Sequence, residues 1–129
     1  MTCRGIRGAV CAESNRPDAI LSATRSLLER IVAANELSTR DLVSAIFTAT
    51  PDLDAVYPAR AARQMGWTHV PLLCVQEMAV EGSLERCVRV LLHWNTDRTP
   101  EAVRHVYLGA ARALRPDLAF PDPTEEDPS

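Results

Sequence analysis

The chain has 129 residues, a formal net charge of −3 and an apolar fraction of 47%. This length is that of a single domain, and this apolar fraction is enough for a hydrophobic core. The slightly acidic balance provides no field that would attract nucleic acid or an anionic membrane, so neither is an expected partner. All 14 positive side chains are arginines, and the lack of lysine excludes Schiff-base chemistry on a lysine.

The cysteines and the amino-terminal segment indicate where the protein works. Cys3, Cys11, Cys74 and Cys87 form no CxxC pair and have no histidine at metal-ligand spacing, so we expect no metal site. The charged start, residues 1–7, is not followed by the apolar core of a signal peptide. No run approaches the ~20 apolar residues of a membrane span. We therefore expect a cytoplasmic protein with free thiols.

Strands and helices are predicted in alternation along the first half of the chain. Residues 2–10 are expected to form a strand. A helix follows, with Asn15 as its amino-terminal cap and Pro17 in its first turn. Its apolar stripe predicts that it runs to about Ala34, where Asn35 can close it in the left-handed conformation.

The second half is predicted to add strands and short helices. The expected elements are a strand over residues 42–50, a helix over 59–65, a hairpin-like pair of strands within 70–94, a strand over 104–108 and a helix over 109–114. This order predicts an α+β fold with a small mixed sheet and helices on one face. Residues 1–118 would form the single domain, and the acidic, proline-rich tail 119–129 is expected to be disordered.

Arg89 is the least expected residue of the chain because it stands inside an apolar strand segment. Alternation separates its side chain from those of Val88 and Val90, which form the other face. A guanidinium in this setting is costly unless it meets an anion or lies on a wet face. Two interpretations follow: a solvated arginine paired with Glu77, or a site that binds an anion. Cys74 is three residues from Glu77, so the two side chains nominally point to opposite faces.

Arginines in apolar strand or turn contexts, together with a strand tyrosine, suggest what the anion is. Arg7, Arg89, Arg115 and Tyr107 suit a small substrate with more than one carboxylate. No Ser/His/Asp arrangement stands out. The three histidines are each isolated in the sequence, and a lone histidine is more often structural than catalytic: His69, His93 and His105.

Several short motifs, in order and at similar spacing over residues 4–118, resemble the monofunctional, AroH-class chorismate mutases. They are Arg4-Gly-Ile-Arg-Gly-Ala9, Thr50-Pro-Asp-Leu53, Pro58-Ala59, Val70-Pro71, Cys74-Val-Gln-Glu-Met78, Arg86-Cys-Val-Arg-Val90, Arg104-His-Val-Tyr-Leu108 and Leu114-Arg-Pro-Asp-Leu118. The resemblance implies a homotrimer of pseudo-α/β-barrel architecture with active sites between subunits. It also implies the Claisen rearrangement of chorismate to prephenate in phenylalanine and tyrosine biosynthesis, without cofactor or covalent intermediate.

The resemblance also assigns roles to individual residues. Arg89 is similar to the arginine that binds the breaking ether oxygen and one carboxylate, and Glu77 and Cys74 match the catalytic pair at the ring hydroxyl. Arg7 and Tyr107 resemble the groups that bind a carboxylate. The other implied substrate contacts are Leu73, Val75 and Gln76 along the substrate, and Tyr57, Arg63 and Arg115 at the far wall and mouth, from an adjacent subunit or the carboxyl-terminal segment.

The sequence departs from the family pattern at two of the implied substrate contacts. Tyr57 stands where phenylalanine is usual, and Leu73 stands where a small polar residue can occur.

The chemistry agrees with the assignment because a pericyclic rearrangement needs positioned charges and no nucleophile. Two other interpretations remain at this point. One is a non-enzymatic trimeric module for small carboxylates, which would need Arg7 and Tyr107 but neither Glu77 nor Arg89. The other, weaker one is an imine deaminase-like protein.

Overall fold

The computed structural model describes residues 2–115. Its strands are β1 (Thr2–Cys11), β2 (Leu42–Ala49), β3 (Leu72–Gln76), β4 (Cys87–Thr96) and β5 (Val106–Tyr107), and its α-helices are α1 (Pro17–Asn35) and α2 (Ala59–Gln64). Short 3-10 helices complete the order: η1 (Thr39–Asp41), η2 (Pro100–Ala102) and η3 (Gly109–Leu114). Every predicted element is present with shifted ends, and the last strand shortens to two residues. The predicted disordered tail lies outside the described residues.

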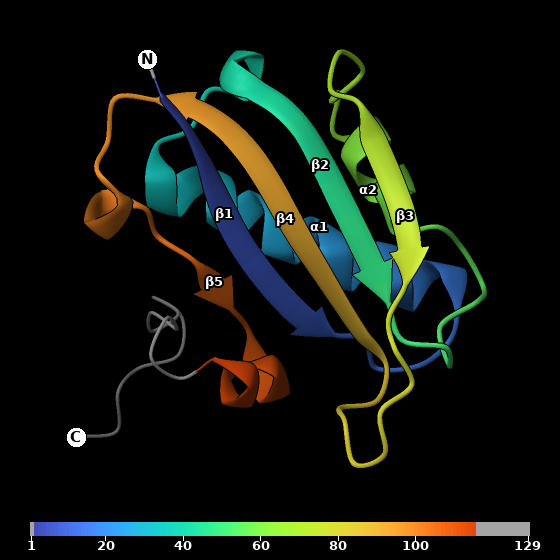
Figure 1. Cartoon of the computed structure of the whole chain (residues 1–129). Helices are drawn as coiled ribbons and strands as arrows, with labels where there is room; N and C mark the ends of the chain where they lie inside the picture. Colours follow the sequence, from blue (N-terminus) through green and yellow to red (C-terminus); the bar gives the residue numbers. More distant parts are fainter. Residues whose placement is uncertain (1, 116–129) are drawn as a thin grey trace.

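The strands form one mixed, five-stranded sheet in the order β3-β2-β4-β1-β5 (Figure 1). β4 pairs antiparallel with β1 and β2, whereas β3 pairs parallel with β2, and β5 parallel with β1. The prediction of a hairpin-like pair was wrong, because β2 lies between β3 and β4. The segment 77–86 is no tight turn, and it is long enough to carry the chain past the end of β2.

The α-helices cover one face of this sheet (Figure 1). α1 packs its apolar stripe there, and its fully buried apolar residues are Ile20, Leu27, Leu28 and Ile31. It lies close to β1, since a Cβ added at Gly8 would stand 2.8 Å from Cδ1 of Ile31. The alternate residues of the central strands complete this core: Ile6, Phe47, Val88, Val90, Leu92 and Trp94. Trp67 also belongs to it. Within residues 2–115, no helix is long and apolar enough to cross a membrane.

Within residues 2–115, the other face of the sheet is covered only at one end, by η3. Ala9, Cys87, Tyr107 and Ala111 form a small buried cluster there, so the prediction of helices on one face holds for the α-helices but not for η3. Two causes raise the pKa of the Cys87 thiol to about 12: burial is the larger, and the neighbouring thiol of Cys11 is the smaller. Cys87 is the first residue of β4 and is almost fully buried.

Neither predicted cap of α1 takes that role. Arg16 occupies the amino-terminal cap position, and no side chain caps that end. Asn15 instead binds the loop before α2, because its carbonyl oxygen accepts the backbone N–H groups of Asp54 (3.0 Å) and Ala55 (3.1 Å). At the other end Glu36, not Asn35, adopts the left-handed conformation, with φ of 50°. Both asparagines are used for contacts with other segments of the chain.

Candidate active site

Arg89 and Glu77 form the centre of the site. Arg89 lies on β4, and its Nε stands 3.4 Å from Oε2 of Glu77. The ion pair that one interpretation of the sequence required is therefore present. Within the described residues, however, the Arg89 Nε atom is buried and has no hydrogen-bond partner, because the carboxylate is near it but not in line with its N–H. The arginine thus keeps a strong donor for a further acceptor.

A cavity of about 220 Å³ opens over this pair on the face of the sheet that the α-helices leave free. Its polar lining comes from Arg7 on β1, Thr48 on β2, Glu77, Arg89 and Tyr107 on β5. Alternation along the antiparallel strands explains the gathering, since Thr48 stands directly opposite Arg89 and Arg7 lies two positions away on the other neighbouring strand. Two cations, one carboxylate and a phenol in one cavity are groups that bind a small anionic molecule.

A larger cavity, of about 620 Å³, lies on the opposite side of β2. Tyr57 and Arg63 line it from the α2 region, and Cys74, Val75 and Gln76 line it from β3. Phe47 and Ala49 of β2 face this cavity, whereas Ile46 and Thr48 face the smaller one. The predicted site residues of one protomer therefore line two separate cavities, one with Arg89 and the other with Tyr57 and Arg63.

Cys74 and Glu77 belong to different groups, as their spacing in the sequence indicated. Cys74 packs against the core on the helix-covered face, while Glu77 reaches the open face. Glu77 follows the last residue of β3, and its backbone N–H donates to the carbonyl of Ala49 at 2.9 Å. Leu73 lines neither cavity and is exposed on the open face. Cys74 and Glu77 therefore line different cavities.

His105 lies close enough to Arg7 and Arg115 to feel the charge of both arginines. The Nδ1 atom of His105 accepts the backbone N–H of Arg7 at 3.0 Å. Burial lowers the pKa of His105, and the charges of Arg7 and then Arg115 lower it further. The neutral imidazole can therefore hold the Arg7 backbone, and Arg115 lies within electrostatic range of both residues. His105 is structural, as is His93, whose ring bonds Ser44 at 2.8 Å.

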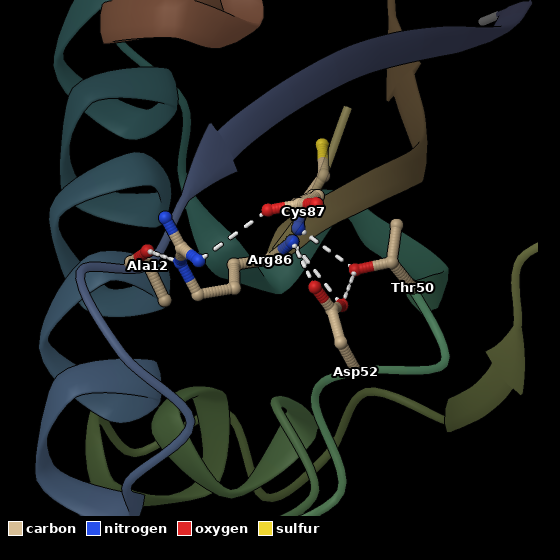
Figure 2. A network of polar contacts seen from close by, with 6 residues as sticks. Ala12, Thr50, Asp52, Arg86 and Cys87 are labelled. Carbon is tan, nitrogen blue, oxygen red and sulfur yellow. Dashed lines mark hydrogen bonds and ion pairs between the residues drawn. The ribbon is translucent and has the colours of Figure 1, made fainter. Parts of the chain in front are cut away.

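A clamp of polar contacts fixes the start of β4, two residues before Arg89 (Figure 2). Both carboxylate oxygens of Asp52 accept the backbone N–H of Arg86, at 2.9 and 3.1 Å. The Thr50 hydroxyl donates to Asp52 and accepts the N–H of Cys87 at 2.9 Å. Arg86 has a φ of 49°, a conformation that non-glycine residues rarely adopt, and these contacts hold it there.

A second clamp positions Tyr107. The side chain of the fully buried Asn35 accepts the backbone N–H of Arg104 at 2.8 Å and donates to its carbonyl at 2.9 Å. This contact ties the end of α1 to the segment that leads into β5. Leu108 then donates to the carbonyl of Ala9 at 3.0 Å, which holds Tyr107 beside β1.

The sequence argument missed the residues that hold the site, namely Asn15, Asn35, Thr48 and Asp52. Asp52 lies in a motif that the resemblance quotes, but its contact with Arg86 joins residues far apart in the sequence. Thr48 could have been noticed as a polar residue in an apolar strand, yet its partner follows from a strand order that the sequence does not give. Within residues 2–115, no group of three or more His, Cys, Asp or Glu side chains could hold a metal ion.

The fold and the site together define an α+β protein with an arginine–carboxylate site for a small anionic molecule on the open face of its sheet. A family model described as chorismate mutase type I matches residues 3–118. The chain is 45% identical over 126 residues to chorismate mutase AroH of Bacillus subtilis, covering 97% of this chain and 99% of that relative. It is 53% identical over 116 residues to chorismate mutase AroH of Thermus thermophilus, covering 89% and 95%.

A solved structure agrees with these relatives. The fold matches a chorismate mutase from Clostridium thermocellum with a TM-score of 0.84 and 46% identity, over 85% of this chain and 98% of that one. The chain therefore belongs to the type I chorismate mutase family, and it is an isomerase of aromatic amino-acid biosynthesis. The family resemblance seen in the sequence is confirmed.

Proposed function

We propose that this chorismate mutase rearranges chorismate to prephenate by holding the folded substrate against Arg89 and Glu77. The observation that carries this proposal is the buried Nε of Arg89, which lacks a hydrogen-bond partner among the described residues and lines the same cavity as Arg7 and Tyr107. When the carbon–oxygen bond breaks, the ether oxygen becomes partly negative and the ring partly positive. Arg89 donates to the oxygen, and the Glu77 carboxylate stabilises the ring and its hydroxyl.

The other groups bind and orient the substrate. Arg7 and Tyr107 engage one carboxylate, and Arg115 adds positive charge at the mouth, an arrangement supported by the influence of Arg7 and Arg115 on His105. Holding the flexible enolpyruvyl group over the ring removes much of the entropic barrier of the rearrangement. No nucleophile or proton transfer takes part, so the mechanism needs no lysine and no catalytic histidine.

We also propose that three copies assemble in the pseudo-α/β-barrel arrangement of the family, with each site built between neighbours. The separation of the two cavities supports this, because Tyr57 and Arg63 line a different cavity from Arg89 within one protomer. The open face further exposes apolar side chains that an assembly would cover, with exposed fractions of 57% for Leu73, 43% for Val75 and 36% for Leu91. β3 is also an edge strand that neighbours can protect.

We also propose a cytoplasmic location, which the free thiols support.

The test of the proposed function is the loss of chorismate absorbance on addition of the purified protein, with prephenate identified in the same sample by NMR. Saturable chorismate binding without loss of absorbance would instead favour the carboxylate-binding module.

Turnover should also be nearly constant around neutral pH, because no group exchanges a proton in the reaction. A bell-shaped profile would favour a proton-transfer enzyme such as the deaminase-like alternative.

A further inference from the structure

Thr48 binds the carboxylate of Glu77, a contact to which the proposed mechanism has so far given no role. Glu77 is the first residue after β3, so the hydrogen bonds of that strand do not orient its side chain. Two contacts with β2 orient it instead. The backbone N–H of Glu77 donates to Ala49 at 2.9 Å, and the Thr48 hydroxyl donates a short hydrogen bond to Oε2 of Glu77.

The same carboxylate oxygen meets Arg89. Thr48 and Arg89 stand directly opposite each other on β2 and β4, and both side chains line the smaller cavity. Oε2 of Glu77 therefore receives the hydroxyl from one strand and lies 3.4 Å from the guanidinium of the other. The hydrogen bonds and ion pairs within residues 2–115 engage this oxygen and leave Oε1 for a substrate hydroxyl.

A carboxylate beside a guanidinium normally rotates until two parallel N–H···O bonds form. In this site such a pair would occupy the Nε donor that the reaction requires. The hydroxyl of Thr48 instead binds the carboxylate from β2, and the Nε atom of Arg89 has no hydrogen-bond partner within residues 2–115. We propose that Thr48 is a positioning residue, which keeps the Glu77–Arg89 pair open so that Arg89 can donate to the substrate; this inference rests on the proposed function.

The experiment removes the hydroxyl while keeping the shape of the side chain. Thr48→Val should lower kcat by about tenfold or more with a smaller change in KM, the scale for one hydrogen bond to a charged group. Thr48→Ser keeps the hydroxyl and should restore kcat to within about threefold of the parent. The matched control is Ser44→Ala, on the same strand and face, whose hydroxyl binds His93 instead. It should leave kcat unchanged.

A double-mutant cycle separates positioning from a general structural effect. In a Glu77→Gln background, Thr48→Val should have little further effect on kcat, because the charged partner is already absent. An equal loss in both backgrounds, or an unchanged kcat in Thr48→Val alone, would overturn the proposal. Thr48→Ala serves in place of valine if the valine variant does not fold. A crystal structure of the variant should show both Glu77 oxygens on Arg89, and an unmoved carboxylate would contradict us.

Failure of this inference is distinguishable from failure of the proposed function. The parent protein is assayed first with chorismate. An inactive parent refutes the function itself and, with it, the role of Thr48. An active parent whose Thr48→Val variant matches it in kcat refutes the positioning role alone.

Discussion

Arg89 is half-exposed in the free chain, with 42% of its side chain accessible, yet its Nε atom is buried without a hydrogen bond within the described residues. This state suits an atom that donates in the transition state more strongly than in the ground state. We predict that Arg89→Ala lowers kcat by on the order of 10² or more, the scale for one preorganised donor. Arg89→Lys should also have a low kcat, because an ammonium cannot reproduce the two-pronged donor of a guanidinium. Steady-state kinetics on folded variants measures both.

Arg63→Ala is the matched control for that experiment, since Arg63 is an exposed arginine that lines the other cavity. Its loss should act mainly on KM, as expected for a group that attracts and seats the substrate. If Arg89→Ala instead kept kcat within a few-fold of the parent and only raised KM, Arg89 would be a substrate anchor. The electrostatic mechanism would then be wrong for this protein.

Cys74 has the reactive side chain nearest to the proposed substrate path, but its surroundings indicate packing. It is half-buried against the core on β3 and lines the larger cavity. We predict that Cys74→Ser retains substantial activity, because a hydroxyl can replace the thiol as a polar neighbour of the ring hydroxyl. Mass spectrometry during turnover should detect no covalent adduct. A trapped mass increase on Cys74 would identify it as a nucleophile.

At the scale of elements, the sequence specified each strand and helix well but not how they pair. Alternation separated Arg89 from Val88 and Val90 correctly, because period-2 patterning depends only on neighbours along the chain. The insertion of β2 between β3 and β4 depends on which strands bury the most surface together, and no local pattern records that. The same limit applies to Thr48 and Asn35, whose partners come from distant segments.

The Asp52 clamp makes β4 sensitive to acid. Burial opposes ionisation of Asp52, but the hydrogen bonds from Thr50 and Arg86 outweigh it and hold the pKa of the carboxyl below its ordinary value of 3.8. A depressed pKa means that the unfolded chain binds the proton more tightly. The stabilisation is therefore present above pH 3.8 and is lost as the pH falls toward the folded-state pKa.

We predict that Asp52→Asn lowers the free energy of unfolding at pH 7 by about 1 kcal/mol, the scale for hydrogen bonds at an exposed site. The difference from the parent should narrow as the pH falls from 5 to 3, since the parent then loses its charged acceptor. Urea unfolding at fixed protein concentration measures this, with Asp41→Asn as a control for the loss of one exposed carboxylate. A gap that widened at low pH would contradict the assignment.

At the scale of the whole molecule, one protomer presents two separate cavities on the two sides of β2. Arg7, Glu77, Arg89 and Tyr107 gather on the open face, and Tyr57 and Arg63 lie beyond β2. The family resemblance implied that neighbours complete each site, whereas composition and periodicity alone gave no indication of it. Within the described residues, the open face exposes the apolar side chains of Leu73, Val75 and Leu91, which favours the proposed assembly, and the placement of the two cavities supports a functional role for it.

We predict a trimer whose sites each take Arg89 from one protomer and Tyr57 with Arg63 from the next. Native mass spectrometry should show the trimer at micromolar concentration. An Arg89→Ala variant and a Tyr57→Ala/Arg63→Ala variant should each have low activity at subsaturating chorismate. Mixing them in equal amounts by co-refolding should restore about one quarter of the parent's sites, because an intact site needs one unaltered half from each variant in the right order. Active monomers, or a mixture no more active than the mean of its parts, would show that each chain completes its own site.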